Sequence, residues 1–102
     1  MKSRRSKTTD ITNKVKRIVY DRDEGRCIIC GRPGYPNSHY ISRAKGGLGI
    51  PENIVTMCIE CHNNYDNGSD LELKNYIKDR TKEYLKRQYI SWNEENLYYK
   101  KY

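Results

Sequence analysis

Apolar residues occur along the chain in short periodic stretches separated by polar and turn-forming residues. Between residues 11 and 23 they recur every three or four positions, which predicts an amphipathic helix. Thr9 or Asp10 can act as its N-cap, and Gly25 can end it. The face that we expect to be buried carries Ile11, Val15, Ile18 and Val19.

Two short apolar runs predict a pair of strands in the middle of the chain. Residues 38–42 follow a segment rich in Gly and Pro, and residues 53–57 form the second run. The Gly-rich residues 45–49 between them predict a loop. A short helix over residues 60–66 is expected next, ended by the Asn67-Gly68 pair.

A longer helix is predicted from residue 69 to about residue 89. Ser69 and Glu72 have the spacing of a capping box, and the expected buried stripe contains Leu73, Ile77, Tyr84 and Leu85. From residue 92 to residue 102 no clear period is present, although Asn93 offers another cap, so the structure of this tail is left open. The order of elements predicts an α+β domain.

The size and composition limit what can stabilise this domain. A chain of 102 residues is enough for one domain. Only 35% of the residues are hydrophobic, and Phe is absent. Packing alone would give a marginal core, so we expect an additional stabilising device. No apolar run approaches the roughly 20 residues that span a bilayer, and no secretory segment follows the start, so we expect a soluble intracellular protein without membrane contact.

The charge distribution favours a polyanionic partner. The formal net charge is +7, and residues 1–26 contain nine basic and four acidic side chains. Lys7, Arg4 and Arg5 belong to a basic arm over residues 1–9. Such a terminal charge run is also compatible with a solvated arm that has no binding role.

Four cysteines form two pairs with identical spacing. Cys27 and Cys30 are separated by two residues, as are Cys58 and Cys61. Four thiolates in this arrangement can complete a tetrahedral zinc site, and Gly31 would let the backbone amides turn toward the sulfurs. Two disulfides or a dithiol redox pair are the alternatives. The pattern predicts a structural zinc ion.

Both histidines lie at the edges of this unit. His62 directly follows Cys61, and Asp66 lies four residues further on, so the two side chains share one face of the expected helix. Such a pair can chelate a second cation, for which Mg, Mn and Zn are candidates. His39 precedes the Gly-rich loop and is the other titratable candidate.

Residues 27–68 resemble the HNH endonucleases, also called ββα-metal or His-Me finger nucleases, and the small phage and prophage members above all. The resemblance rests on the two cysteine pairs and three further segments: His39-Tyr40-Ile41-Ser42-Arg43 with Lys45-Gly46-Gly47, Glu52-Asn53-Ile54-Val55, and the His62 that follows Cys61. It implies a small zinc-stabilised, treble-clef-like ββα-metal domain with flanking helices.

The resemblance also implies roles for individual residues. His39 matches the general base, Asn53 the residue that steadies the loop and the base, and His62 a ligand of the catalytic cation. Where the family commonly has an Asp or His ligand, this chain has Ser38, whose hydroxyl is a poorer ligand, and Asp66 can supply the carboxylate. An inverted assignment, in which His39 is a ligand, stays open here.

The function implied is a metal-dependent DNA endonuclease that nicks or cuts duplex DNA with a His base and one divalent cation (Mg, Mn, Ni or Zn), leaving 5′-phosphate and 3′-hydroxyl ends. Arg43 and Lys45 beside the base, together with Arg4, Arg5 and Lys7, would meet phosphates. The alternative is a noncatalytic zinc-stabilised DNA-binding or adaptor module.

The chain is thus expected to form one domain with four parts. These are a basic arm (1–9), an N-terminal helix (10–26), the zinc site with the HNH motif (27–68), and a C-terminal helix with a Tyr-rich tail (69–102). The resemblance suggests the cytoplasm of a bacterial or phage-infected cell as the location and phage packaging proteins as candidate partners. It leaves the oligomeric state open.

Overall fold

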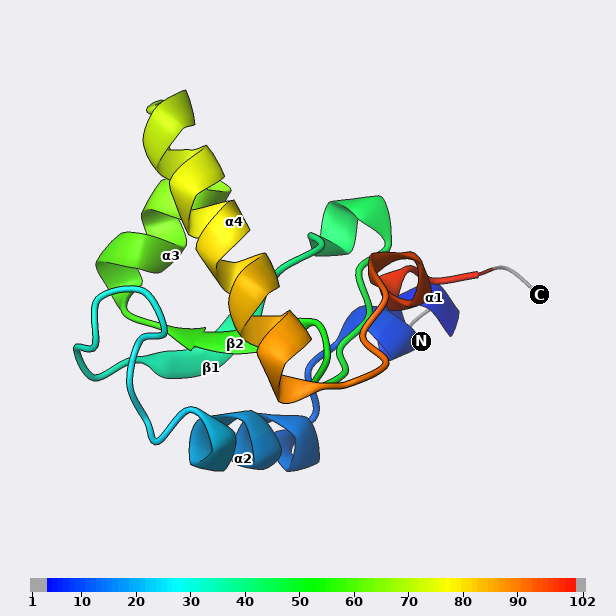
Figure 1. The fold of residues 1–102 in the computed structure, drawn as a ribbon. Helices are drawn as coiled ribbons and strands as arrows, with labels where there is room; N and C mark the ends of the chain where they lie inside the picture. Colours follow the sequence, from blue (N-terminus) through cyan, green and yellow to red (C-terminus); the bar gives the residue numbers. More distant parts are fainter. Residues whose placement is uncertain (1–3, 101–102) are drawn as a thin grey trace.

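The computed structural model describes residues 4–100, and of residues 4–6 the backbone alone. Figure 1 shows two short strands with helices on both sides of them. The elements are α1 (Arg4–Thr9), α2 (Asn13–Arg22), β1 (Tyr35–His39), the 3₁₀ helix η1 (Arg43–Lys45), β2 (Ile54–Met57), α3 (Ile59–Asp66), α4 (Leu71–Gln88) and the 3₁₀ helix η2 (Glu94–Leu97). The expected α+β class is therefore confirmed.

The two strands form an antiparallel pair that α3 follows directly. Ser38 lies opposite Val55 and His39 opposite Ile54, whereas Tyr35 lies opposite Met57. The register therefore shifts between Tyr35 and Ser38, as at a β-bulge. A bulge re-aims the side chains next to it, and such irregularities are frequent beside functional sites.

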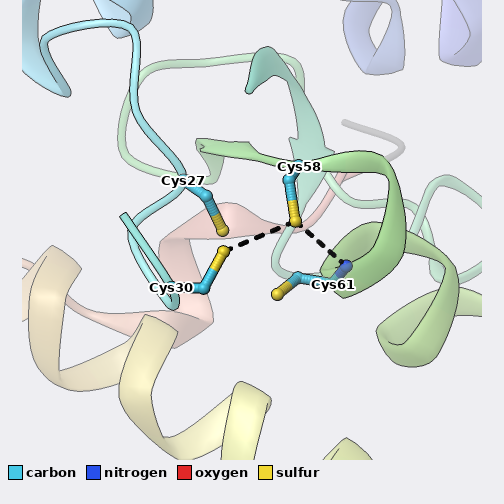
Figure 2. A group of neighbouring side chains, drawn as sticks. All are labelled: Cys27, Cys30, Cys58 and Cys61. Atoms are coloured by element: carbon cyan, nitrogen blue, oxygen red, sulfur yellow. Dashed lines mark hydrogen bonds between the residues drawn. The ribbon is translucent and has the colours of Figure 1, made fainter. Parts of the chain in front are cut away.

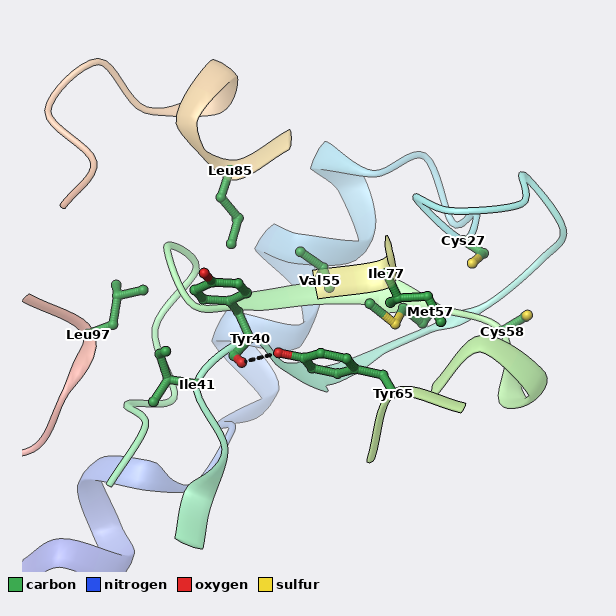
Figure 3. Packing of buried hydrophobic residues seen from close by; sticks show 10 residues of the cluster. All are labelled: Cys27, Tyr40, Ile41, Val55, Met57, Cys58, Tyr65, Ile77, Leu85 and Leu97. Atoms are coloured by element: carbon green, nitrogen blue, oxygen red, sulfur yellow. Dashed lines mark hydrogen bonds between the residues drawn. The ribbon is translucent and has the colours of Figure 1, made fainter. Parts of the chain in front are cut away.

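The faces of β2 pack against different helices. Val55 and Met57 belong to the main hydrophobic cluster with Ile77 and Leu85 of α4 (Figure 3). Helix α2 lies across the other side of the strands (Figure 1), where Val19 is fully buried. The apolar run of the sequence is thus continuous because both faces of β2 are covered.

A buried ion pair ties α2 to the rest of the domain. The Arg22 guanidinium donates to the Asp23 carboxylate at 2.7 Å and to the carbonyl oxygen of Ile54 at 2.7 Å. Asp23 also accepts from the backbone N–H of Thr56 and from the hydroxyl of Tyr84. Every group in this network has a partner, which is the condition for tolerating charge in a core.

The connection between β1 and β2 is long and is held from several sides. The backbone N–H of Leu48 donates to the carbonyl oxygen of Leu97, and that of Tyr99 donates to Gly46. The Tyr-rich tail, whose structure the sequence left open, therefore pairs with this loop. Asn93 does cap η2, because its side chain accepts from the N–H of Glu95.

The sequence predicted the positions of the helices more accurately than the identity of their N-cap residues. The N-cap of α2 is Thr12, whose hydroxyl accepts from Val15, and not Thr9 or Asp10. The N-cap of α4 is Asp70 and not Ser69. Of the expected buried face of α2, Val19 is buried while Ile18 is 42% exposed.

Helix α4 keeps most of its expected stripe. Ile77 and Leu85 are buried, Leu73 and Tyr84 are partly buried, and Thr81, which the prediction omitted, is buried as well. The hydroxyl of Thr81 donates to the carbonyl oxygen of Ile77, so its polar group is satisfied within the helix.

One further expectation was wrong in detail. The first strand was expected over residues 38–42, but β1 ends at His39 because the backbone of Ile41 bonds the side chain of Asn53 instead of a neighbouring strand. The basic arm over residues 1–9 is helical over Arg4–Thr9, and residues 1–3 lie outside the described part. Thr9, at the end of this helix, is buried.

No helix between residues 4 and 100 has both the length and the apolar character that a membrane crossing requires.

Candidate metal centre and catalytic cleft

The four cysteines meet at one point between the loop after α2 and the start of α3. Their sulfur atoms all lie within 4.8 Å of one another, and those of Cys30 and Cys58 are 3.6 Å apart (Figure 2). A tetrahedral thiolate site with zinc–sulfur bonds of about 2.3 Å has sulfur–sulfur distances of about 3.8 Å. The donor set therefore fits a structural metal ion such as zinc.

Backbone amides already stabilise thiolate in this cluster. Burial opposes ionisation of Cys27, but N–H groups of Cys30, Cys58 and Ile29 outweigh it and lower the pKa of Cys27 to about 7. The N–H of Cys61 points to the sulfur of Cys58, which caps α3. Metal sites commonly show such donors around the ligand atoms. One cluster of four thiols also disfavours two separate redox pairs.

A separate open cleft brings the two histidines together. Its volume is about 700 Å³, and none of the cysteines lines it. The lining residues are Asp10, Ile11, Lys16, Asn37, His39, Ser42, Arg43, Ala44, His62 and Asp66. β1, α3 and the segment before α2 therefore contribute to the same surface.

His39 is held at the end of β1 by a backbone carbonyl group. Its side chain is largely buried, and its Nε2 atom lies 2.9 Å from the carbonyl oxygen of Thr9. Because a carbonyl only accepts, Nε2 carries the hydrogen and Nδ1 keeps the lone pair. Burial lowers the pKa of His39 below 6.5, and the nearby Arg43 adds to this effect. The imidazole is therefore neutral near pH 7.

His62 and Asp66 lie one turn apart on α3 and face each other. The Nε2 atom of His62 is 2.8 Å from a carboxylate oxygen of Asp66, and both side chains are partly exposed to solvent. An imidazole nitrogen and a carboxylate oxygen are a donor set that divalent cations of borderline or hard character accept. These two residues can therefore hold a cation at the cleft.

Asn53 is fully buried and bridges the two ends of the long loop. Its side-chain oxygen accepts from the N–H of Ile41, and its side-chain N–H₂ donates to the carbonyl oxygens of Ile41 and Leu48. Its backbone carbonyl accepts from Tyr40, the residue after His39. These are the contacts that a residue steadying the loop requires.

Ser38 does not reach the cleft, which corrects the expectation that it sits at a ligand position. Its side chain is fully buried, and its hydroxyl lies 3.4 Å from the sulfur of Met57 on the core side of β1. Neighbouring residues of a strand point to opposite faces, so His39 on the cleft side implies Ser38 on the core side. Asn37 lines the cleft instead, beside the bulge.

The basic candidates are divided between two places. Arg43 lines the cleft and pairs with Asp10, and the exposed Lys45 lies in a neighbouring pocket. Lys7 is exposed on α1. The side chains of Arg4 and Arg5 lie outside the described part of the chain.

Sequence reasoning missed several residues of the cleft. The carbonyl of Thr9 has no sequence signature, because every residue carries one. Asn37 could have been found from the alternation of β1, since it is two residues before His39. Lys16 and Asp10 come from the segment around α2, and only the tertiary fold brings them here.

Comparison with known proteins finds a matching family model and a solved structure with a similar fold. Residues 27–68 match the family model described as HNH endonuclease. The structure is similar to that of the type IV phosphorothioation-dependent restriction endonuclease ScoMcrA, with a TM-score of 0.55 and 20% sequence identity. The match covers 83% of this chain and 23% of that one, so this chain spans less than a quarter of that protein. At this identity the likeness concerns the fold alone. No curated protein matches the chain significantly.

Proposed function

We propose that this protein is a metal-dependent endonuclease that hydrolyses phosphodiester bonds of DNA, because residues 27–68 match the family model described as HNH endonuclease. The observation that carries the proposal is the cleft in which His39, His62 and Asp66 lie together. A neutral imidazole and a pair of cation ligands on one surface are the groups that hydrolysis of a phosphodiester needs.

His39 is the general base of the proposed reaction. Its Nε2–H is committed to the carbonyl of Thr9, so Nδ1 accepts the proton of the attacking water. The lowered pKa keeps Nδ1 unprotonated at neutral pH, and the hydrogen bond to Thr9 fixes the plane of the ring. The lone pair on Nδ1 is what a general base requires, and the inverted assignment, in which His39 is a ligand, would use the same lone pair.

His62 and Asp66 are the ligands of the proposed catalytic cation, for which Mg, Mn, Ni and Zn are the candidates. When bound, such an ion supplies Lewis-acid stabilisation of the negative charge that develops on the phosphate and on the leaving oxygen. The two side chains come from consecutive turns of α3, and β2 and the cysteine cluster fix the start of that helix. We assign the cysteine cluster to structural zinc.

Substrate binding is assigned to basic side chains around the cleft. Arg43 lies at its wall, Lys45 lies next to it, and Lys7, Arg4 and Arg5 belong to α1. Contacts of this kind go to phosphates and set affinity without reading sequence. Hydrolysis would leave a 5′-phosphate and a 3′-hydroxyl end, as in the family.

The second candidate function is a noncatalytic DNA-binding or adaptor module stabilised by zinc. The observation that favours it is the burial of Ser38, because β1 then provides no ligand from that position and two protein ligands remain for the cation. Phage packaging partners, a cytoplasmic location, and the choice between nicking and double-strand cleavage stay predictions.

Cleavage of supercoiled plasmid distinguishes the two functions. The zinc-loaded protein is incubated with Mg, Mn or Ni, or without added cation, beside the His39→Ala variant. We expect cation-dependent nicking or linearisation that the variant loses while it keeps its zinc and its DNA affinity. Absence of cleavage with every cation, with DNA binding retained, supports the noncatalytic module. Full cleavage by His39→Ala contradicts the assigned base.

A further inference from the structure

A second pocket adjoins the catalytic cleft. Its volume is about 200 Å³, and it shares Ser42 and Asp66 with the cleft, so the two form one continuous surface. Its other walls come from the long loop, the first half of α4 and the C-terminal tail.

Three lysines give this pocket its chemical character. Lys45 comes from η1, whereas Lys74 and Lys78 lie four residues apart on the same face of α4. Within residues 4–100, none of these three ammonium groups forms an ion pair. Three positive charges from two distant segments therefore converge on one small space.

The acidic residues of the pocket already have partners. Asp66 faces His62 at 2.8 Å, and Glu94 accepts a hydrogen bond from the hydroxyl of Tyr40 at 2.7 Å and lies 3.9 Å from Lys82. The carboxylates of Asp66 and Glu94 thus interact with these groups and not with the three lysines. The ammonium groups of the lysines therefore remain available to an anion that enters from solvent.

The size of the pocket limits that anion. Sites for whole small molecules usually measure about 300–1,000 Å³, so a space of about 200 Å³ suits a single anionic group. We propose that Lys45, Lys74 and Lys78 bind a backbone phosphate of the DNA strand whose neighbouring phosphate occupies the cleft. This inference rests on the proposed function and adds α4 to the DNA-binding surface.

The proposal defines the path that the bound DNA strand takes across the protein surface. From the cleft it passes over Ser42 and Asp66 and reaches the first half of α4. A phosphate held there fixes the position of the scissile bond relative to His39, and it carries no sequence information.

Salt-dependent binding tests the lysine pocket independently of catalysis. Duplex DNA is titrated into His39→Ala protein and into the same protein with K74Q and K78Q, between 50 and 200 mM salt. Each phosphate contact contributes about −0.9 to the slope of log affinity against log salt. We expect the slope to become shallower by about 0.9, so that the loss of affinity over this range is about 3.5-fold smaller.

Helix α4 offers a matched control. Arg80 and Arg87 are exposed and lie on the opposite side of the helix from Lys78, two and nine residues further along. R80Q with R87Q removes the same charge and should leave the slope nearly unchanged. An equal change of slope with the arginine pair and with the lysine pair would show that only the total charge of the protein matters, and it would overturn the proposal. An unchanged slope with K74Q and K78Q would overturn it as well.

A modified substrate locates the contact. Single phosphates on either side of the cut are replaced by neutral methylphosphonates, and the affinity of each duplex is measured. We expect one replacement to weaken binding by about 3-fold or more in the parent protein and to have a clearly smaller effect with K74Q and K78Q, where only Lys45 remains in the pocket. Additive losses at every position would contradict the pocket. K78E alone, at an exposed position of α4, provides a second variant if the double substitution lowers stability. These experiments measure DNA binding and do not require cleavage. They therefore test the lysine pocket even if the protein does not cleave plasmid DNA.

Discussion

The Nε2 atom of His39 lies 2.9 Å from the carbonyl oxygen of Thr9, thirty residues earlier in the chain. This contact joins β1 to the end of α1 and determines which ring nitrogen is free. The proposed base therefore depends on a segment outside residues 27–68, the part that matches the family.

The pH dependence of cleavage should report the state of His39. Burial lowers its pKa below 6.5, and the neutral form is the base, so kcat/KM rises with pH and levels off on the alkaline side. The charged or titratable groups around it are Arg43, His62 and Asp66. We expect the midpoint of the acid limb below 6.5, measured by plasmid nicking at constant cation concentration. A midpoint above 7 contradicts this environment.

Gly49→Ala should displace the segment that holds His39. The N–H of Gly49 donates to the carbonyl of Thr8 at 2.9 Å, and a Cβ atom there would lie 2.0 Å from the carbonyl oxygen of Asp10. The backbone must move apart, and a shift of this size in a catalytic group costs about 10- to 100-fold in rate. Cleavage kinetics measure the effect, and cobalt absorption of the cysteine cluster checks that the metal centre is intact. Cleavage at the wild-type rate would contradict the positioning role of residues 8–10.

Asn37→Asp and Ser38→Asp form a matched pair. Asn37 is exposed at the cleft that His62 also lines, so a carboxylate there adds a negative donor to this cleft and should strengthen Mn binding several-fold. Ser38 is fully buried, so a carboxylate there should cost several kcal/mol of stability and add no ligand. Isothermal titration with Mn and urea unfolding measure the two effects. Stronger Mn binding by a folded Ser38→Asp variant would refute this placement.

Asn53→Ala should destabilise the domain far more than the loss of a surface amide. The substitution leaves the N–H of Ile41 and the carbonyl groups of Ile41 and Leu48 without their buried partner, at a cost of roughly 2–4 kcal/mol. Asn93→Ala removes an exposed N-cap and should cost about 1 kcal/mol. Urea unfolding compares them, and equal costs would show that the long loop does not depend on Asn53.

Removal of the zinc ion proposed for the cysteine cluster should unfold the domain. Once the cation is gone, no bond joins the four sulfur atoms, and the first turn of α3 loses its anchor. We expect one zinc ion per chain, and a fall in Tm of more than about 10 °C with a chelator or with Cys58→Ala. Added zinc should restore the chelated wild type and leave Cys58→Ala unchanged. A zinc-free protein that melts at the wild-type temperature would argue against this role.

Local sequence signals accounted for the metal centre and for most of the helices. Cysteine spacing alone placed Cys27 and Cys61 in one cluster, and the Asn67-Gly68 pair marked the end of α3 correctly. These signals act over a few residues, so no tertiary information is needed to read them.

Positions that depend on tertiary contacts were less predictable. Thr9 is a reasonable N-cap by residue type, but the fold places its carbonyl at His39, and Thr12 caps α2 instead. The bulge before Ser38 depends on how the two strands pair. The resemblance to a family does not predict the position of such a bulge in this chain. The same limitation applies to the convergence of Lys45 and Lys74, which come from separate segments.

The contact between α1 and β1 has a consequence for protein engineering. A graft of residues 27–68 into another scaffold would carry the four-cysteine cluster, the long loop and α3, but it would leave behind the carbonyl of Thr9 that selects the tautomer of His39. The host scaffold would have to present an acceptor at the same place. A host designed to move that acceptor on demand would make the rate of the proposed cleavage follow the host's conformation.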